Sequence, residues 1–199
     1  MEAALKGVLN SYWPTLSVVL CVVVILRVTY IVRSDRSSFK IHKELLGLLF
    51  IAYLLILFEM VLSQDIGGGG TNLMPFREIL RYDIGTKGFY KQVVGNILAF
   101  IPLGYFASYY CKIKNLGVIT FITLLISLLI EFVQRFIGRC FDIDDIILNV
   151  IGGIIGFLIF ICLSAIKKHL PKILQKDIIY DIITIFIGVL IVLYIVRIF

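Results

Sequence analysis

The sequence predicts an all-α fold, a polytopic membrane helix bundle with about six transmembrane helices, in a single membrane domain over residues 1–199. Two features of the composition support this class. Apolar residues make up 60% of the chain and charged residues only 16%, whereas soluble domains are about 45–50% apolar and about 25% charged. The mean hydropathy is +1.04. A water-soluble domain of this length cannot bury so much apolar surface, and a disordered chain would need low hydrophobicity.

The third observation is a series of six stretches that are long and apolar enough to cross a bilayer. A hydrocarbon core of about 30 Å requires about 20 helical residues. The expected spans are Pro14–Val32, Leu45–Ser63, Gln92–Cys111, Leu116–Gln134, Ile146–Ile166 and Ile178–Val196. The first also has some character of a signal peptide because Lys6 precedes its apolar core, but it lacks a small-residue cleavage site and is long for such a segment. Pro102 interrupts the third, which is the most polar span.

The connections between these spans predict the orientation. Short connections on one face hold ten of the 19 basic residues: Arg33, Arg36, Lys40, Lys43, Lys112, Lys114, Lys167, Lys168, Lys172 and Lys176. Because Lys and Arg concentrate in cytoplasmic loops, we expect both termini to be extracellular. No basic helix stands apart from the apolar segments, so the expected partners are membrane lipids and no nucleic acid is expected.

The long outer connection, residues 64–91, is the one sizeable segment that the pattern leaves outside the spans. The glycine run Gly67–Gly70 predicts a flexible hinge. The following segment, Asn72–Phe76, is apolar for a loop. We therefore expect it to lie at the membrane interface, or to re-enter the membrane where protein satisfies its backbone.

A polar stripe runs along the expected fourth span, through Thr120, Thr123, Ser127, Glu131 and Gln134. Spacings of 3, 4, 4 and 3 residues place all of them on one helix face, which must face protein or water. Contacts between helices explain the hydroxyls. A charge inside the membrane costs about 2.5–3.5 kcal/mol, so Glu131 needs a partner. Arg135 at i+4 and Arg139 in the next turn are the candidates.

The fifth span carries acids at its start and small residues below them. The acids are Asp142, Asp144 and Asp145, and we expect Asp144 or Asp145 to cap the helix. At least one of the three then remains to pair with Arg139 or to serve a site. A second stripe follows, through Asn149, Gly152, Gly153 and Gly156. Its glycines allow another helix to approach closely.

The expected topology brings polar residues of several segments to the outer membrane interface. The predicted ligand-binding residues are Asn72, Arg77, Asn96, Glu131, Gln134, Arg139, Asp142, Asp145 and Asn149. The two guanidinium groups suit bidentate recognition of phosphate or carboxylate. The asparagines would orient a ligand through hydrogen bonds. Together these residues predict a polar pocket of mixed charge at the outer leaflet.

Four blocks of the sequence resemble the VanZ-like family: Asn72–Phe76, Gly95–Gly104, Ser127–Gln134 and Arg139–Gly153. The resemblance covers residues 64–163, which we take as a VanZ-like core region. It implies a small multi-pass protein of the bacterial cell membrane, in a family whose named member confers low-level resistance to teicoplanin. The family motif residues carry over as Asn72, Pro75, Asn96, Pro102, Glu131, Gln134, Arg139, Asp142, Asp145 and Asn149. The resemblance assigns no chemical role to them.

The residues leave three functions open. The first is a binder that holds a lipid, or a lipid-linked cell-envelope precursor, and so changes how a lipoglycopeptide antibiotic engages the cell surface. The second is a membrane-embedded hydrolase or transferase in which Glu131 is the candidate general base. The third is a small lipid transporter, which intramembrane acids such as Glu59 and Asp181 would favour.

Metal or cofactor chemistry has little support in the sequence. Asp142 and Asp145 are weak candidates for holding a divalent cation through oxygen ligands. Both histidines, His42 and His169, fall in inner connections and cannot reach an outer site. No cofactor is expected, and nothing near Cys140 activates its thiol.

Overall fold

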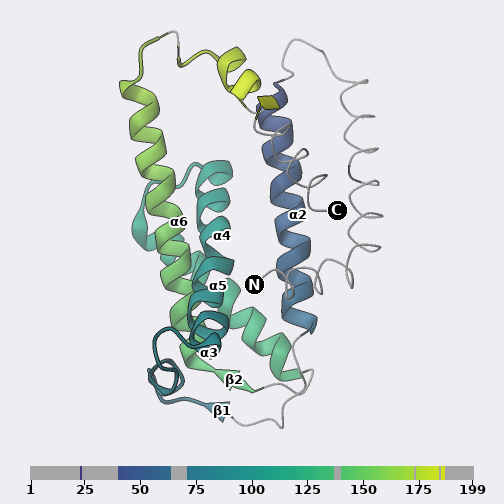
Figure 1. Cartoon of the computed structure of the whole chain (residues 1–199), viewed down its shortest axis with the longest axis vertical. Helices are drawn as coiled ribbons and strands as arrows, with labels where there is room; N and C mark the ends of the chain where they lie inside the picture. Colours follow the sequence, from purple (N-terminus) through teal and green to yellow (C-terminus); the bar gives the residue numbers. More distant parts are fainter. Residues whose placement is uncertain are drawn as a thin grey trace. The chain divides into compact units, whose positions relative to one another are not determined.

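The computed structural model describes residues 23, 40–63, 71–136, 140–172, 174–183 and 185–186, with the side chains of residues 59–63 excepted. Four long helices account for most of these residues, namely α2 (Ile41–Ser63), α4 (Gly95–Cys111), α5 (Leu116–Phe136) and α6 (Ile143–His169). The shorter elements are β1 (Thr71–Asn72), the 3₁₀ helix η2 (Ile79–Arg81), α3 (Lys87–Phe89), the π-helix η3 (Tyr90–Val94) and β2 (Phe141–Asp142). Figure 1 shows them along the chain.

The chain forms two compact units. One combines Met1–Leu55 with Leu170–Phe199, and the other is Ile56–His169. The second unit contains α4, α5 and α6 together with the short elements, and it includes all the described residues of the predicted ligand-binding set.

Four helices of the described residues are long and apolar enough to cross a membrane: Ile41–Phe58, Lys87–Cys111, Leu116–Phe136 and Ile143–His169. They confirm the second to fifth predicted spans, and the third begins earlier than predicted because α3 and η3 lead directly into α4. The predicted first span, apart from Val23, and most of the sixth lie outside the described residues, as do Gly67–Gly70 and Arg139.

Close backbone contact joins α6 to α4, which lie side by side in Figure 1. A Cβ atom added at Gly152 would lie 2.2 Å from the carbonyl oxygen of Ile97, and one added at Gly156 would lie 2.0 Å from that of Ile101. From the other side, a Cβ atom at Gly104 would lie 2.0 Å from the carbonyl oxygen of Gly153. The glycine pattern therefore works as predicted, since only hydrogen fits between these two helices.

The polar stripe of α5 faces the interior of the Ile56–His169 unit, as predicted. Thr123, Ser127, Glu131 and Gln134 are all buried. Thr123 donates its hydroxyl to the carbonyl of Ile119 at 2.8 Å, and its side chain fills the space left by Gly153 of α6. Thr123 of the stripe therefore serves helix packing, and the one charged residue of the stripe, Glu131, lies toward its other end.

In the other unit, two acids of the helical segment 177–183 contact residues at the start of α2. The amide and Nδ1 of His42 contact Oδ1 of Asp181 at 2.7 and 2.6 Å, and the Lys40 ammonium pairs with Asp177. The hydrogen bond from Lys40 lowers the pKa of Asp177 from its ordinary value. Asp181 is therefore tied to the start of α2.

Candidate functional site

A short parallel bridge brings two of the sequence blocks together at one end of α5 and α6. β1 pairs with β2 in the register Thr71 with Phe141 and Asn72 with Asp142. The two strands lie beside each other next to the helix ends (Figure 1). The bridge joins the long connection, which contains β1, to the turn between two membrane spans. Polar residues of both segments, such as Asn72 and Asp142, therefore lie side by side.

Asp142 is the centre of the first group of contacts. Its Oδ1 accepts hydrogen bonds from Nδ2 of Asn72 at 2.8 Å and from the amide of Asp144 at 2.9 Å. Because α6 begins at the next residue, the second contact is an N-cap interaction. The prediction that Asp144 or Asp145 caps this helix is therefore wrong. The Asp142 amide in turn donates to Oε2 of Glu131 at 2.9 Å.

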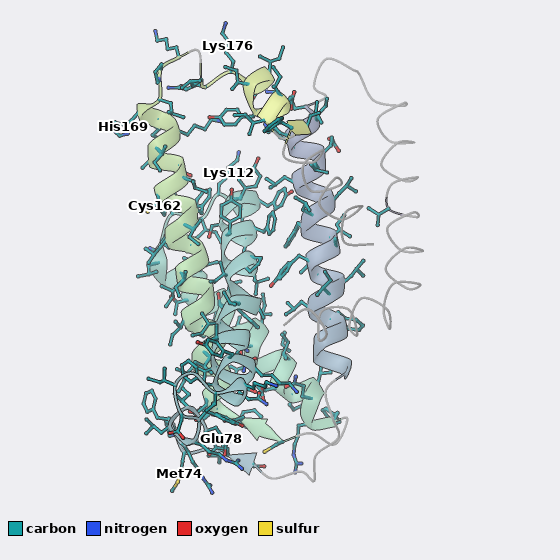
Figure 2. All side chains as sticks on the ribbon, viewed as in Figure 1. Met74, Glu78, Lys112, Cys162, His169 and Lys176 are labelled. Carbon is teal, nitrogen blue, oxygen red and sulfur yellow. The ribbon has the colours of Figure 1, made fainter. Side chains whose placement is uncertain are left out.

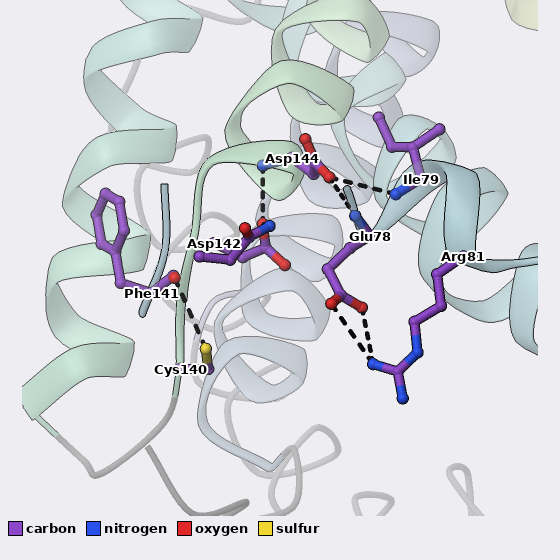
Figure 3. Close-up of polar contacts among 8 residues, drawn as sticks. Glu78, Ile79, Arg81, Cys140, Phe141, Asp142 and Asp144 are labelled. Carbon is purple, nitrogen blue, oxygen red and sulfur yellow. Dashed lines mark hydrogen bonds and ion pairs between the residues drawn. The ribbon is translucent and has the colours of Figure 1, made fainter. Parts of the chain in front are cut away.

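Asp144 has a different role that the sequence did not predict. Its carboxylate is fully buried and accepts three backbone hydrogen bonds from one turn, from the amides of Phe76 at 2.5 Å, Glu78 at 2.7 Å and Ile79 at 3.2 Å. Figure 3 shows two of these contacts. The turn donates as a small nest of N–H groups, and the carboxylate locks it to the start of α6.

The described arginines near this end lie at its surface. Arg77 is exposed, and no hydrogen bond of its guanidinium is found among the described residues. Arg81 instead forms an ion pair with Glu78, with Nη1 3.1 Å from Oε2 (Figure 3). Arg135 is exposed too, and in the described part of the chain no ion pair joins it to Glu131. Arg139 lies outside the described residues.

Two asparagines connect the bundle at the same end. Asn96 of α4 donates through Nδ2 to Oδ1 of Asp145 at 2.6 Å and to the carbonyl of Gln92 at 2.9 Å. Asn149 of α6 donates through Nδ2 to the hydroxyl of Ser127 at 2.9 Å. Asn149 is only 4% exposed, yet its Oδ1 has no hydrogen-bond partner among the described residues. This carbonyl is an acceptor that a ligand could use.

Glu131 and Gln134 complete the buried end of the polar stripe. Glu131 is 1% exposed and Gln134 is 6% exposed. Glu131 reaches the α5–α6 turn through the Asp142 amide, so its carboxylate lies within the polar end of the bundle and is shielded from lipid. The predicted convergence of Asn72, Asn96, Glu131, Gln134, Asp142, Asp145 and Asn149 on one end of the unit therefore has a structural basis.

The candidate cation ligands are already engaged with amide side chains. Oδ1 of Asp142 is used by Asn72, and Oδ1 of Asp145 by Asn96. Within the ranges that the structure describes, no group of three or more His, Cys, Asp or Glu side chains is placed to hold a metal ion. Cys140 is exposed, and its thiol contacts the carbonyl of Phe141 at 3.7 Å.

Burial changes the pKa of the Asp142 carboxyl. Desolvation raises the pKa of its carboxyl above the ordinary value of 3.8. Hydrogen bonds from the Asp144 amide and from Asn72 oppose the shift, and the nearby carboxylates of Asp144 and Glu78 add to it. Asp142 thus holds its proton more readily than a surface aspartate.

Asp142→Asn is expected to flatten the pH dependence of stability. Because the folded pKa lies above the unfolded one, the native state binds more protons between them. The stability contributed by Asp142 is then full below the unfolded pKa and is lost as pH rises through the folded pKa. Asparagine keeps the Oδ1 acceptor that Asn72 and the Asp144 amide use, so the variant should be at least as stable as the wild type at neutral pH. Thermal midpoints in detergent across the acidic range test this. An unchanged pH profile would contradict it, and Asp83→Asn, an exposed carboxylate, is the control.

Comparison with known families identifies the family of this chain. The VanZ/LLP1 family profile matches residues 16–164, which is most of the chain. The chain belongs to the VanZ/LLP1 family. The match extends beyond the predicted core region of residues 64–163 and reaches into the predicted first span. No curated protein and no solved structure shows a significant match. The VanZ/LLP1 region thus includes β1, β2 and the described polar end of the bundle.

Proposed function

We propose that this VanZ/LLP1 protein binds the headgroup of a lipid, or of a lipid-linked cell-envelope molecule, at the polar end of α4, α5 and α6. The observation that carries the proposal is the carbonyl of Asn149, which is buried and has no hydrogen-bond partner in the described part of the chain. Leaving a buried polar atom unpaired costs about 1–3 kcal/mol, and a bound donor group would remove that cost.

The described residues favour a ligand that donates hydrogen bonds. Asn149 presents its buried Oδ1 inside the bundle, and this atom can only accept a hydrogen bond. A sugar hydroxyl or a headgroup amine would therefore suit the interior. Arg77, which is exposed next to the turn held by Asp144, would suit a phosphate at the rim.

The proposed setting is the outer leaflet of a bacterial cell membrane, with both termini extracellular. The concentration of basic residues in the opposite connections supports this orientation. A headgroup held at this leaflet would change the number of envelope precursors that a lipoglycopeptide can reach. The expected phenotype is altered resistance to teicoplanin or to related lipoglycopeptide antibiotics.

Asn149→Leu is expected to reduce lipid retention and resistance without unfolding the protein. Leucine has a similar volume, but it removes the donor to the buried Ser127 hydroxyl, which costs about 1–3 kcal/mol of stability. The thermal midpoint of the variant is therefore measured beside its lipid retention. A hydrogen bond worth about 0.5–1.5 kcal/mol corresponds to a loss of up to about tenfold in occupancy. Native mass spectrometry of lipids that copurify in mild detergent measures occupancy, and the minimal inhibitory concentration of teicoplanin in a susceptible host measures resistance.

Thr120→Ala is the matched control for this experiment. Thr120 belongs to the same polar stripe but lies at the other end of α5, where its hydroxyl donates to the carbonyl of Leu116 at 2.8 Å. We expect it to leave both lipid occupancy and resistance unchanged. Equal lipid retention by Asn149→Leu and the wild type, at equal membrane abundance, would refute the binding site.

An enzyme that acts on the same lipid is the second candidate, and the raised pKa of Asp142 favours it. A carboxyl that holds its proton could donate it to a leaving group as a general acid. Incubation of the purified protein with labelled envelope lipids distinguishes the two functions. Turnover that is lost in Asp142→Asn supports catalysis, whereas retention of unaltered lipid supports binding alone.

A further inference from the structure

We propose that the segment from Leu73 to Ile84, here called the anchor segment, is seated in the headgroup layer of the bilayer and contacts anionic phospholipids. It belongs to none of the four spans of the described residues, and it lies in the sequence between the span that ends at Phe58 and the span that begins at Lys87. Its apolar side chains are nevertheless strongly exposed. This combination is typical of a peripheral membrane contact.

Two residues of the anchor segment are more exposed than any large apolar residue of the four spans. Ile84 is 87% exposed and Leu80 is 83% exposed, the highest values among the large apolar residues that the structure describes. Leu73, Met74 and Phe76 are each more than half exposed. Figure 2 labels Met74 and Glu78 in this segment, at one end of the Ile56–His169 unit. In water, so many apolar side chains on one short loop would be unfavourable.

The anchor segment is held in a way that keeps these side chains outward. Asp144 binds the amides of Phe76, Glu78 and Ile79, and the β1–β2 bridge binds the residues just before Leu73. The backbone is therefore fixed to the start of α6 and cannot turn its apolar residues into the bundle. The exposed side chains need a partner outside the unit.

The position and charge of the segment indicate that this partner is the bilayer. Its two attachments are to β2 and α6, at the point where one span begins, and α3 starts the next span at Lys87, three residues after Ile84. The segment therefore lies at the level of a membrane boundary. The segment itself is balanced, with Arg77 and Arg81 against Glu78 and Asp83, and Arg81 pairs with Glu78. The excess positive charge beside it comes from the exposed Lys87 and Lys91. Such residues extend their charges toward lipid phosphates while their stems cover apolar surface.

Tryptophan fluorescence in lipid nanodiscs tests the proposal on the full chain. Leu80→Trp and Ile84→Trp are prepared separately in a Trp13→Phe background, which removes the one native tryptophan. Both positions are so exposed that the larger side chain requires no repacking. Nanodiscs with brominated acyl chains quench a tryptophan in lipid, and acrylamide quenches one in water. Lys114→Trp, in the short exposed connection after α4, is the reference position.

We expect both anchor variants to show at least twofold more lipid quenching than Lys114→Trp and correspondingly less acrylamide quenching. The difference should be larger in phosphatidylglycerol than in phosphatidylcholine nanodiscs, and Lys87→Gln with Lys91→Gln should remove that lipid preference. Quenching by acrylamide alone would place the segment in water and overturn the proposal. Protection from both quenchers would show that protein covers it and would overturn the proposal equally.

Discussion

Asp144→Ala is expected to destabilise the Ile56–His169 unit by about 3 kcal/mol or more. The carboxylate is fully buried and accepts three backbone hydrogen bonds from a single turn. Hydrogen bonds to charged groups contribute about 1.5–3 kcal/mol each, and water recovers part of this where the freed amides reach the surface. The thermal midpoint in detergent measures the loss of stability. Hydrogen exchange at Phe76, Glu78 and Ile79 measures the release of the turn.

Two further variants separate this role from a general effect of charge. Asp83→Ala removes an exposed carboxylate of the same segment and should change the free energy of unfolding by no more than about 0.5 kcal/mol. Asp144→Asn keeps the volume and one acceptor but turns a donor toward the amides of the turn. It should therefore be destabilised less than Asp144→Ala. If Asp144→Ala and Asp83→Ala had equal thermal midpoints, Asp144 would not hold the turn.

The helices and their packing faces could be predicted from the sequence because each depends on a local period. In α5, the spacing of Ser127, Glu131 and neighbouring polar residues defined the buried face before any partner was known. In α6, the spacing of Gly152 and Gly156 defined a face for close approach. A helix turns by a constant angle per residue, so its own sequence specifies which residues share a face.

The partners within the polar end could not be predicted in the same way. The pairing of Asn72 with Asp142 joins residues 70 positions apart through a two-residue bridge, which is too short to leave a period in the sequence. Charge suggested Arg135 or Arg139 as the partner of Glu131, and Arg139 lies outside the described residues. The structure adds backbone amides and asparagine side chains as donors to Asp142, Asp144 and Asp145, and these donors have no signature in composition.

These contacts give separate roles to the three acids at the start of α6. Asp142 caps the helix and binds Asn72, Asp144 anchors the turn of the same connection, and Asp145 holds Asn96 of α4. The acids thus tie the long connection and α4 to the start of one span. The three aspartates chiefly hold the segments of the polar end together. Binding or chemistry at this end depends on the groups that they position around Glu131 and Asn149.

Gly104→Ala is expected to destabilise the helix bundle strongly for so small a change. A Cβ atom at this position would lie 2.0 Å from the carbonyl oxygen of Gly153 and 2.8 Å from its Cα atom. Both atoms belong to the backbone of α6, so no side-chain rotation relieves the overlap. The two helices must separate and lose packing along their length, which we expect to cost about 3 kcal/mol or more. Thermal unfolding in detergent and the amount of folded protein in membranes measure the effect.

Gly95→Ala provides the matched control because it makes the same chemical change in the same helix. Its Cβ atom would meet only the carbonyl oxygen of Tyr90, at an ordinary 3.5 Å. Replacing a helical glycine by alanine without a clash should stabilise the protein by about 0.5–1 kcal/mol. Gly104→Ala should therefore lower the free energy of unfolding and Gly95→Ala should raise it. Both variants gain the same helix propensity of alanine over glycine, so the difference between them measures the overlap with α6. If Gly104→Ala were as stable as Gly95→Ala, α4 and α6 would not be in backbone contact. The contact between Asn96 and Asp145, which depends on the spacing of these helices, would then also be in error.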